Sequence, residues 1–153
     1  RMNDLHFMNQ AYQEALKVFD EGEVPVGAVV VRKGAVIGRG HNRCEHLVDA
    51  TAHAEIIALG AASQTAGTWR LVDCTMYVTL EPCLMCLGAL LQARLQALVY
   101  ASADPRCGAI ESFFYRQEAQ RAYRRFPRVT SGIMEDRCSE LLKSFFARRR
   151  NER

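Results

Sequence analysis

The stretch "LVDCTMYVTLEPCLMCLGALLQA" (residues 71–93) changes character at one point. Residues 71–80 carry β-branched and aromatic side chains typical of a strand. The remainder is rich in Leu, Ala and Met, which favour a helix, and Pro82 is well suited to a first helical turn. We therefore predict a strand that passes directly into a helix, with Cys83 and Cys86 at the start of that helix.

The same alternation continues on both sides of this stretch. Apolar residues recur at three and four along residues 4–20, and "RKG" marks a turn within residues 26–41. Thr51 is a plausible N-cap, after the polar loop "RCEHLVDA". The remaining predictions are helices over 52–62, 111–125 and 134–150, and strands over 97–102 and 128–133. This order predicts an α/β fold, a three-layer α/β/α sandwich around a five-stranded mixed sheet.

Size and composition restrict the class of protein. The chain has 153 residues, of which 49% are hydrophobic and 24% charged, which is typical of a globular domain. With no repeat or linker, we expect one domain over residues 1–153. No run is long and apolar enough for a membrane span, and no signal peptide is evident, so we expect no membrane partner and a cytoplasmic location. The six cysteines are then expected to be reduced.

The basic residues gather at one end. Residues 1–115 contain 9 basic and 12 acidic side chains, whereas residues 116–153 contain 11 basic and 5 acidic ones. Of the 20 basic residues, 17 are Arg, whose guanidinium binds phosphates and stacks on bases. The pattern indicates a nucleic-acid partner; a solvated helix face explains the charge alone equally well.

A second stretch, "TAHAEII" (residues 51–57), supplies a partner for the two cysteines. His53, Cys83 and Cys86 would give zinc three protein ligands, which leaves a position for water, as in catalytic zinc sites. Glu55, two residues after His53, can reach that water and carry its proton. Taken alone, the histidine could be a packed core residue, and the C-x-x-C motif could be a redox pair. His46 is a weaker candidate for a fourth ligand.

The spacing H-x-E…P-C-x-x-C is the zinc deaminase signature. Together with "GEVPVGAVVV", "HN", "TAHAEI", "YVTLEPCLMCLGAL" and "ADPRCGA", it resembles the bacterial tRNA-specific adenosine deaminases (TadA type). These belong to the zinc-dependent cytidine/deoxycytidylate deaminase superfamily, so the resemblance implies a cytidine deaminase-like fold. The likeness is nearly continuous from residue 21 to 110, and the flanking helices fit it too.

The resemblance implies hydrolytic deamination of adenosine to inosine at the wobble position of a tRNA anticodon, with tRNA-Arg as substrate. It implies one Zn²⁺ per subunit on His53, Cys83 and Cys86, with Glu55 as the catalytic proton shuttle. It also implies a homodimer, for which "LLQARLQALV" (residues 90–99) offers either interface or core residues. The residues expected to bind substrate are Asn42, Val26 and Ala54 around the base, Asp104 and Arg106 beside the neighbouring nucleotides, and Arg148, Arg149 and Arg150 along the phosphates.

Some positions depart from the family pattern. Ala50 stands where proline is usual, "IESFF" (110–114) replaces Gly-Ser-Leu, and residues 116–128 lack an Asn-His pair. Glu111 is expected to add a negative charge near the RNA path. Two rival functions remain: a deaminase of free guanine or cytosine, and a non-catalytic, zinc-stabilised RNA-binding subunit.

Overall fold

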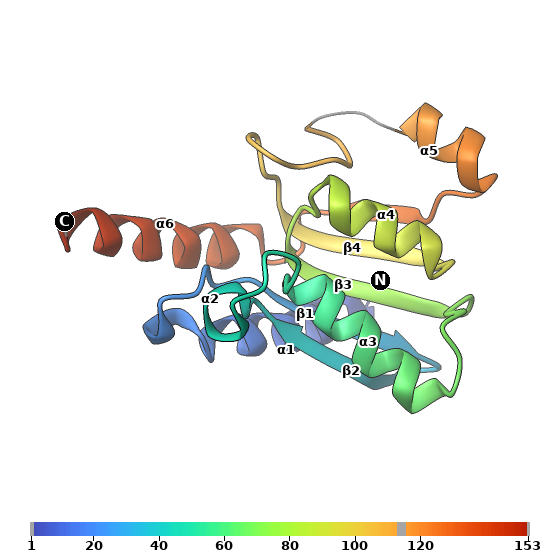
Figure 1. Cartoon of the computed structure of the whole chain (residues 1–153), viewed down its shortest axis with the longest axis horizontal. Helices are drawn as coiled ribbons and strands as arrows, with labels where there is room; N and C mark the ends of the chain where they lie inside the picture. Colours follow the sequence, from blue (N-terminus) through green and yellow to red (C-terminus); the bar gives the residue numbers. More distant parts are fainter. Residues whose placement is uncertain (1, 113–115, 153) are drawn as a thin grey trace.

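The computed structural model describes residues 2–112 and 116–152. Five strands form one mixed sheet in the order β2-β1-β3-β4-β5 (Figure 1). β1 is antiparallel to β2 and β3, whereas β3, β4 and β5 run parallel. In chain order the elements are α1 (Met2–Leu16), the 3-10 helix η1 (Phe19–Glu21), β1 (Gly27–Arg32), β2 (Ala35–His41), α2 (Cys44–Leu47), α3 (Ala54–Ala66), β3 (Cys74–Leu80), α4 (Leu84–Gln92), β4 (Ala97–Ser102), α5 (Arg116–Tyr123), β5 (Arg128–Ser131) and α6 (Glu135–Asn151).

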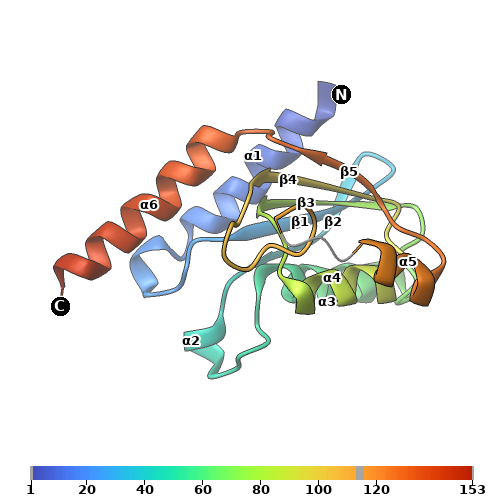
Figure 2. The ribbon, with the colours of Figure 1, turned by 90° about the horizontal axis from the view of Figure 1, so that it is seen from above.

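Helices cover both faces of the sheet. Figure 2 shows α1 and α6 on one face and α3, α4 and α5 on the other. The predicted three-layer sandwich with a five-stranded mixed sheet is therefore confirmed. The C-terminal part of α6 runs past the end of the sheet, beside η1, where the Phe19 and Phe145 rings lie 6.2 Å apart (Figure 1). No helix within the described residues is both long and apolar enough to cross a bilayer.

Two apolar clusters fill the space between the layers. Alternate residues of a strand point to opposite faces, so Val30 packs towards α3 and α4 while Val29 packs towards α1. Burying one such side chain stabilises the fold by about 1.5–3 kcal/mol. Leu90, Leu95 and Leu98 are buried in the first cluster, so these three residues of segment 90–99 serve the core, one of the two roles considered for the segment.

Glycines on β2 allow α3 to lie very close to the sheet. A Cβ at Gly40 would collide with the backbone of Ala54 and Ala58, and one at Gly38 with the backbone of Ala58 and Ala62. The first turn of α3 is therefore pressed against the end of β2, which fixes where the side chains of that turn project.

The start of α3 differs from the sequence prediction. Thr51 is not its N-cap: the Thr51 backbone and hydroxyl both donate to the Asp49 carboxylate, at 2.8 Å. His53 occupies the N-cap position, but its side chain makes no capping hydrogen bond. The first helical N–H, that of Ala54, is instead satisfied by Asn42 from the end of β2, at 3.1 Å. The helix also extends past residue 62, to Ala66.

Other boundaries differ as well. Pro82 precedes the N-cap, Cys83, and so lies just outside α4. The segment predicted to be a polar loop contains the short helix α2, and the helix predicted over 4–20 ends at Leu16. Within the prediction of a helix over 111–125, residues 111 and 112 form a turn and α5 covers Arg116–Tyr123; residues 113–115 lie outside the described residues.

Candidate active site and metal centre

The sheet topology brings four segments to one edge. Val26 precedes β1, Asn42 follows β2, Cys83 lies just after β3, and residues 103–112 follow β4. Because β1 runs opposite to its two neighbours, its amino end meets the carboxyl ends of β2 and β3. Sites of α/β proteins lie at this kind of edge, where helix N-termini also point.

Three side chains converge there on a common point. The Nδ1 atom of His53 lies 3.6 Å from the Cys83 sulfur and 3.5 Å from the Cys86 sulfur. Within residues 2–112 and 116–152, this is the group of metal-ligand side chains whose donor atoms all lie within 4.8 Å of one another. Tetrahedral zinc, with Zn–N and Zn–S bonds of about 2.0–2.3 Å, places such donors about 3.5 Å apart. The donor set therefore fits a tetrahedral metal ion.

The position of these donors favours deprotonated cysteine. His53 and Cys83 are the N-caps of α3 and α4, and Cys86 lies in the first turn of α4. Hydrogen bonds from Cys86 and His53 lower the pKa of the Cys83 thiol to about 4, although burial opposes the change. The hydrogen bond to Cys83 raises the pKa of His53, and the same network raises the pKa of Cys86. The thiolate form, which binds metal, is therefore favoured at Cys83.

Glu55 lies beside the donors without being one of them. It is the second residue of α3, it is buried, and its carboxyl group contacts Cys86. Burial raises the pKa of Glu55 to about 7. A carboxyl group that titrates near neutrality can accept a proton and return it, which general acid–base catalysis requires.

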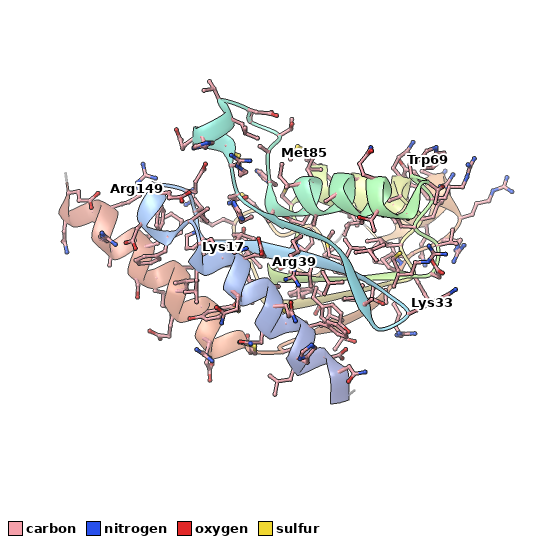
Figure 3. The ribbon with its side chains drawn as sticks, turned by 90° about the horizontal axis from the view of Figure 1, so that it is seen from below. Lys17, Lys33, Arg39, Trp69, Met85 and Arg149 are labelled. Carbon is pink, nitrogen blue, oxygen red and sulfur yellow. The ribbon has the colours of Figure 1, made fainter. Side chains whose placement is uncertain are left out.

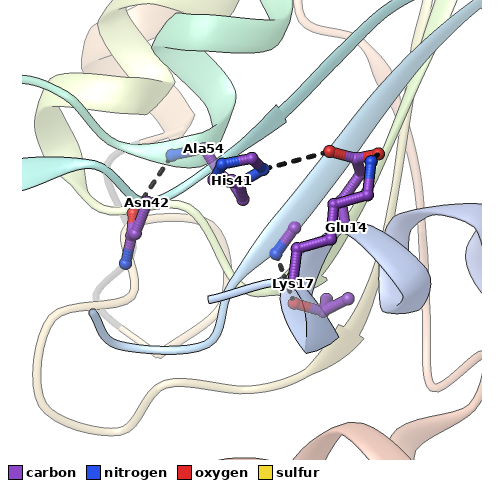
Figure 4. Close-up of polar contacts among 7 residues, drawn as sticks. Glu14, Lys17, His41, Asn42 and Ala54 are labelled. Carbon is purple, nitrogen blue, oxygen red and sulfur yellow. Dashed lines mark hydrogen bonds and ion pairs between the residues drawn. The ribbon is translucent and has the colours of Figure 1, made fainter. Parts of the chain in front are cut away.

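Asn42 joins three parts of the site. Its Oδ1 accepts from the Ala54 backbone N–H at 3.1 Å (Figure 4). Its Nδ2 donates to the Val24 carbonyl at 3.0 Å. The Asn42 backbone N–H donates to the carbonyl of Val26, whose side chain is buried. The amide orientation of Asn42 is therefore fixed on both sides, and the N–H of Ala54 is already bonded within the protein.

A buried carboxylate on α1 supports the same corner (Figure 4). Glu14 bonds the His41 ring at 3.1 Å and the Lys17 ammonium at 2.6 Å. Burial by itself would raise the pKa of Glu14, but hydrogen bonds from Lys17 and His41 outweigh it, and the pKa lies below its usual value. Because His41 precedes Asn42, this network ties the end of β2 to α1.

A cationic groove of about 560 Å³ lies between the loop after β4 and α6. In the loop, the Asp104 carboxylate accepts from the N–H groups of Arg106 and Cys107, at 3.0 and 3.2 Å. The groove is lined by Arg106, Leu142, Lys143, Phe146, Arg149 and Arg150. Figure 3 shows Arg149 projecting from the distal end of α6.

Arg148 points elsewhere. It pairs with Asp20 at 2.6 Å and lies over the Phe19 ring, 5.5 Å from its centroid. The three consecutive arginines expected along the phosphates are therefore divided. Arg150 lines the groove, Arg149 lines it and also donates to the Gly22 carbonyl after η1 at 3.4 Å, and Arg148 is bound to η1.

Comparison with known proteins matches the geometry to a family. Residues 2–150 match the MafB19-like deaminase family model. A tRNA-specific adenosine deaminase of Agrobacterium fabrum is 43% identical over 148 residues, which are 95% of each chain. One of Bacillus subtilis is 38% identical over 147 residues, or 96% of this chain and 91% of that protein. The chain belongs to the tRNA-specific adenosine deaminase family.

Solved structures agree with this membership. One from a study of A-to-I editing by tRNA:A34 deaminases at the wobble position of transfer RNA is 43% identical, with a TM-score of 0.84, over 89% of this deaminase and 98% of that chain. A guanine deaminase of Bacillus subtilis is 40% identical but covers only 64% of this chain and 63% of its own, with a TM-score of 0.61.

Two buried carboxylates of the deaminase were not singled out as site residues from the sequence. Glu23 accepts from the N–H groups of Glu45 and His46, at 3.1 and 2.9 Å, and so holds α2. His46, considered as a fourth ligand, lies outside the group of metal donors found among the described residues.

Glu81 accepts hydrogen bonds from residues 104–112. In the sequence, the feature that indicates a site role for Glu81 is its place directly after a buried strand, in "TLEPC".

Proposed function

We propose that this protein hydrolytically deaminates adenosine to inosine at the wobble position of a tRNA anticodon, with tRNA-Arg as a substrate. The observation that carries the proposal is the buried Glu55 beside the convergent donors of His53, Cys83 and Cys86. Names of relatives that are 36–43% identical over nearly the whole chain support the choice of substrate.

The cofactor is one Zn²⁺ per subunit, bound by His53, Cys83 and Cys86. When bound, zinc supplies a Lewis acid that lowers the pKa of a bound water towards neutrality. Glu55 accepts a proton from the water that attacks C6 of the adenine. It gives this proton to the ring nitrogen. It then carries the proton of the new C6 hydroxyl group to the departing amino group, which leaves as ammonia, so that adenosine and water become inosine and ammonia.

The base-binding pocket is formed by Asn42, Val26 and Ala54. Asn42 retains one amide hydrogen and one carbonyl lone pair beyond its contacts with Val24 and Ala54, and these are suited to a purine. Val26 provides an apolar wall. Ala54 contributes its backbone at the start of α3, whose N–H belongs to the Asn42 bond rather than to the base.

The RNA crosses the groove between the loop after β4 and α6. Arg106, Arg149 and Arg150 bind phosphates there, and Asp104 shapes the loop that carries Arg106. Phe146, whose side chain is 44% exposed, offers a ring on which a base can stack. Arg148 contributes less, because Asp20 already neutralises it. Flipping the wobble base into the site costs little, since it lies in an unpaired loop.

The active unit is a homodimer in the cytoplasm, and residues 1–153 form one domain in each subunit. Three apolar side chains of the α3–α4 face are exposed: Trp69 at 48%, Leu84 at 57% and Met85 at 37%. Trp69 also lines a hollow of about 320 Å³ with Leu59, Ala89 and Ala93 (Figure 3 labels Trp69 and Met85). An apolar face of this kind favours self-association.

The test is incubation of the zinc-loaded protein with an adenosine-containing tRNA-Arg anticodon stem-loop, with mass-spectrometric detection of inosine. Free guanine and cytosine are run in parallel. We expect inosine in the stem-loop and no turnover of the free bases; turnover of guanine or cytosine with an inert stem-loop would instead establish the free-base rival. Binding of the stem-loop without any product would favour a non-catalytic RNA-binding subunit.

A further inference from the structure

Glu81, between β3 and α4, is 2% exposed, and its carboxylate accepts hydrogen bonds from one loop. Oε1 accepts from the Asp104 N–H at 3.0 Å and from the Ser112 hydroxyl at 2.6 Å. Oε2 accepts from the N–H groups of Ile110, Glu111 and Ser112, at 3.0, 2.8 and 3.0 Å. All five donors come from one segment, residues 104–112, and they gather on a carboxylate, a group that only accepts hydrogen bonds.

The same segment is also attached to the approach to α4. The Ala109 N–H donates to the Pro82 carbonyl at 2.9 Å, and Gly108 forms an isolated bridge with Cys83. A Cβ on Gly108 would collide with the Glu81 carboxyl group. Segment 104–112 is thus wrapped closely around Glu81, next to a candidate metal ligand.

A second contact fixes the far end of the segment. The hydroxyl of Tyr100, in β4, donates to the Glu111 carboxylate at 2.7 Å. The charge of Glu111, expected near the RNA path, is therefore engaged with the sheet. The segment carries Asp104 and Arg106 at its start, so its position determines where the arginine meets the groove.

We propose that Glu81 is a positioning residue that holds segment 104–112 between the metal centre and the cationic groove, and that it thereby governs capture of the RNA substrate rather than the chemical step. The expected effect on KM depends on the proposed function, with RNA as the substrate. Its structural part, the attachment of residues 110–112 to the carboxylate, does not depend on any substrate.

The test compares Glu81→Gln with Glu23→Gln, which makes the same chemical change in the buried carboxylate that holds α2. Glutamine replaces one accepting oxygen with a donor, so two or three of the five bonds are lost. In Glu81→Gln we expect amide hydrogen exchange to accelerate about tenfold or more at residue 104 or at residues 110–112, whichever amides face the glutamine nitrogen, as the loss of charge-assisted bonds predicts. Glu23→Gln should leave exchange at all these amides unchanged.

The kinetic arm measures the KM and kcat of both the parent and Glu81→Gln for the stem-loop, together with zinc content. We expect KM to rise about tenfold, kcat to change less than about threefold, and zinc to remain at one per chain. Unchanged exchange and KM would overturn the proposal. So would loss of zinc and kcat at constant KM, since Glu81 would then serve the metal centre.

Ser112→Ala provides a milder variant if Glu81→Gln does not fold. It removes only the hydroxyl donor, so KM should rise about two- to threefold with kcat and zinc content unchanged. A Ser112→Ala protein with the parent's KM would contradict the proposal. If the parent itself forms no inosine, the proposed function fails, while the exchange measurement still decides whether Glu81 holds the segment.

Discussion

His53 and Glu55, two residues apart at the start of α3, face the same site in different ways. The His53 imidazole lies within 3.6 Å of both cysteine sulfurs, whereas the Glu55 carboxyl group is buried against Cys86. The difference arises because His53 is the N-cap, with extended backbone, and Glu55 is inside the helix. One residue can therefore hold a metal while the other handles protons.

Metal removal should both inactivate and destabilise the protein. Because the metal binds the folded donors, chelation is expected to lower Tm and abolish deamination. Added Zn²⁺ should restore both, and Mg²⁺, which prefers oxygen ligands, should restore neither. Differential scanning fluorimetry with parallel activity assays checks this. Full activity of a protein shown to be metal-free would contradict the role of His53, Cys83 and Cys86.

Asn42→Ala should weaken the start of α3. The variant loses the acceptor for the Ala54 N–H and the donor to the Val24 carbonyl, at a cost of about 1–2 kcal/mol in the free energy of unfolding. Urea unfolding measures this loss. Asn42→Asp keeps the acceptor at Ala54 and should retain more stability than Asn42→Ala; equal losses in the two variants would argue against the capping role.

The salt dependence of RNA binding should separate Arg149 from its neighbour. Arg149→Ala is expected to weaken stem-loop binding and to reduce the slope of log K against log salt by about 0.7–0.9. Arg148→Ala is the matched control, since Arg148 pairs with Asp20 and lies outside the groove. Fluorescence anisotropy across a salt series gives both slopes, and identical effects of the two substitutions would exclude the groove as the phosphate path.

Acid stability should depend on Glu14. Its folded-state pKa is below the usual 4.5, so the carboxylate contributes stability above that pH and loses the contribution as pH falls through the folded pKa. Glu14→Gln is expected to lower the free energy of unfolding by about 2 kcal/mol at pH 7. The gap between the two proteins should close as the pH falls through the folded-state pKa of Glu14, which urea unfolding at several pH values measures. A gap independent of pH would contradict the assignment.

Structural features that depend only on neighbouring residues are the ones that the sequence predicts most clearly. The strand over β3, the helix that follows it and the cysteine pair at their junction all depend on local patterns. They form close to the predicted bounds, although the strand begins at Cys74 rather than at residue 71. The adjacent residues alone favour Thr51 as the cap, but Asn42, 12 positions away from Ala54, supplies the bond.

Long-range contacts explain the other omissions. The donors to Glu81 lie 23–31 positions along the chain, and those to Glu23 lie 22 and 23 positions away. The periodic pattern of apolar residues cannot reveal contacts between residues so far apart in the chain. The division of the three arginines on α6 likewise depends on where Asp20 and Arg106 are brought by the fold.

Glu55→Gln tests the central claim most directly. The substitution keeps the size of the side chain and removes its ability to accept and return a proton, so inosine formation in the stem-loop should fall by a factor of about 10²–10⁴. Zinc content and stem-loop affinity, measured on the same preparation, should match the parent. A Glu55→Gln protein that binds zinc and forms inosine at the parent's rate would contradict the proposed mechanism.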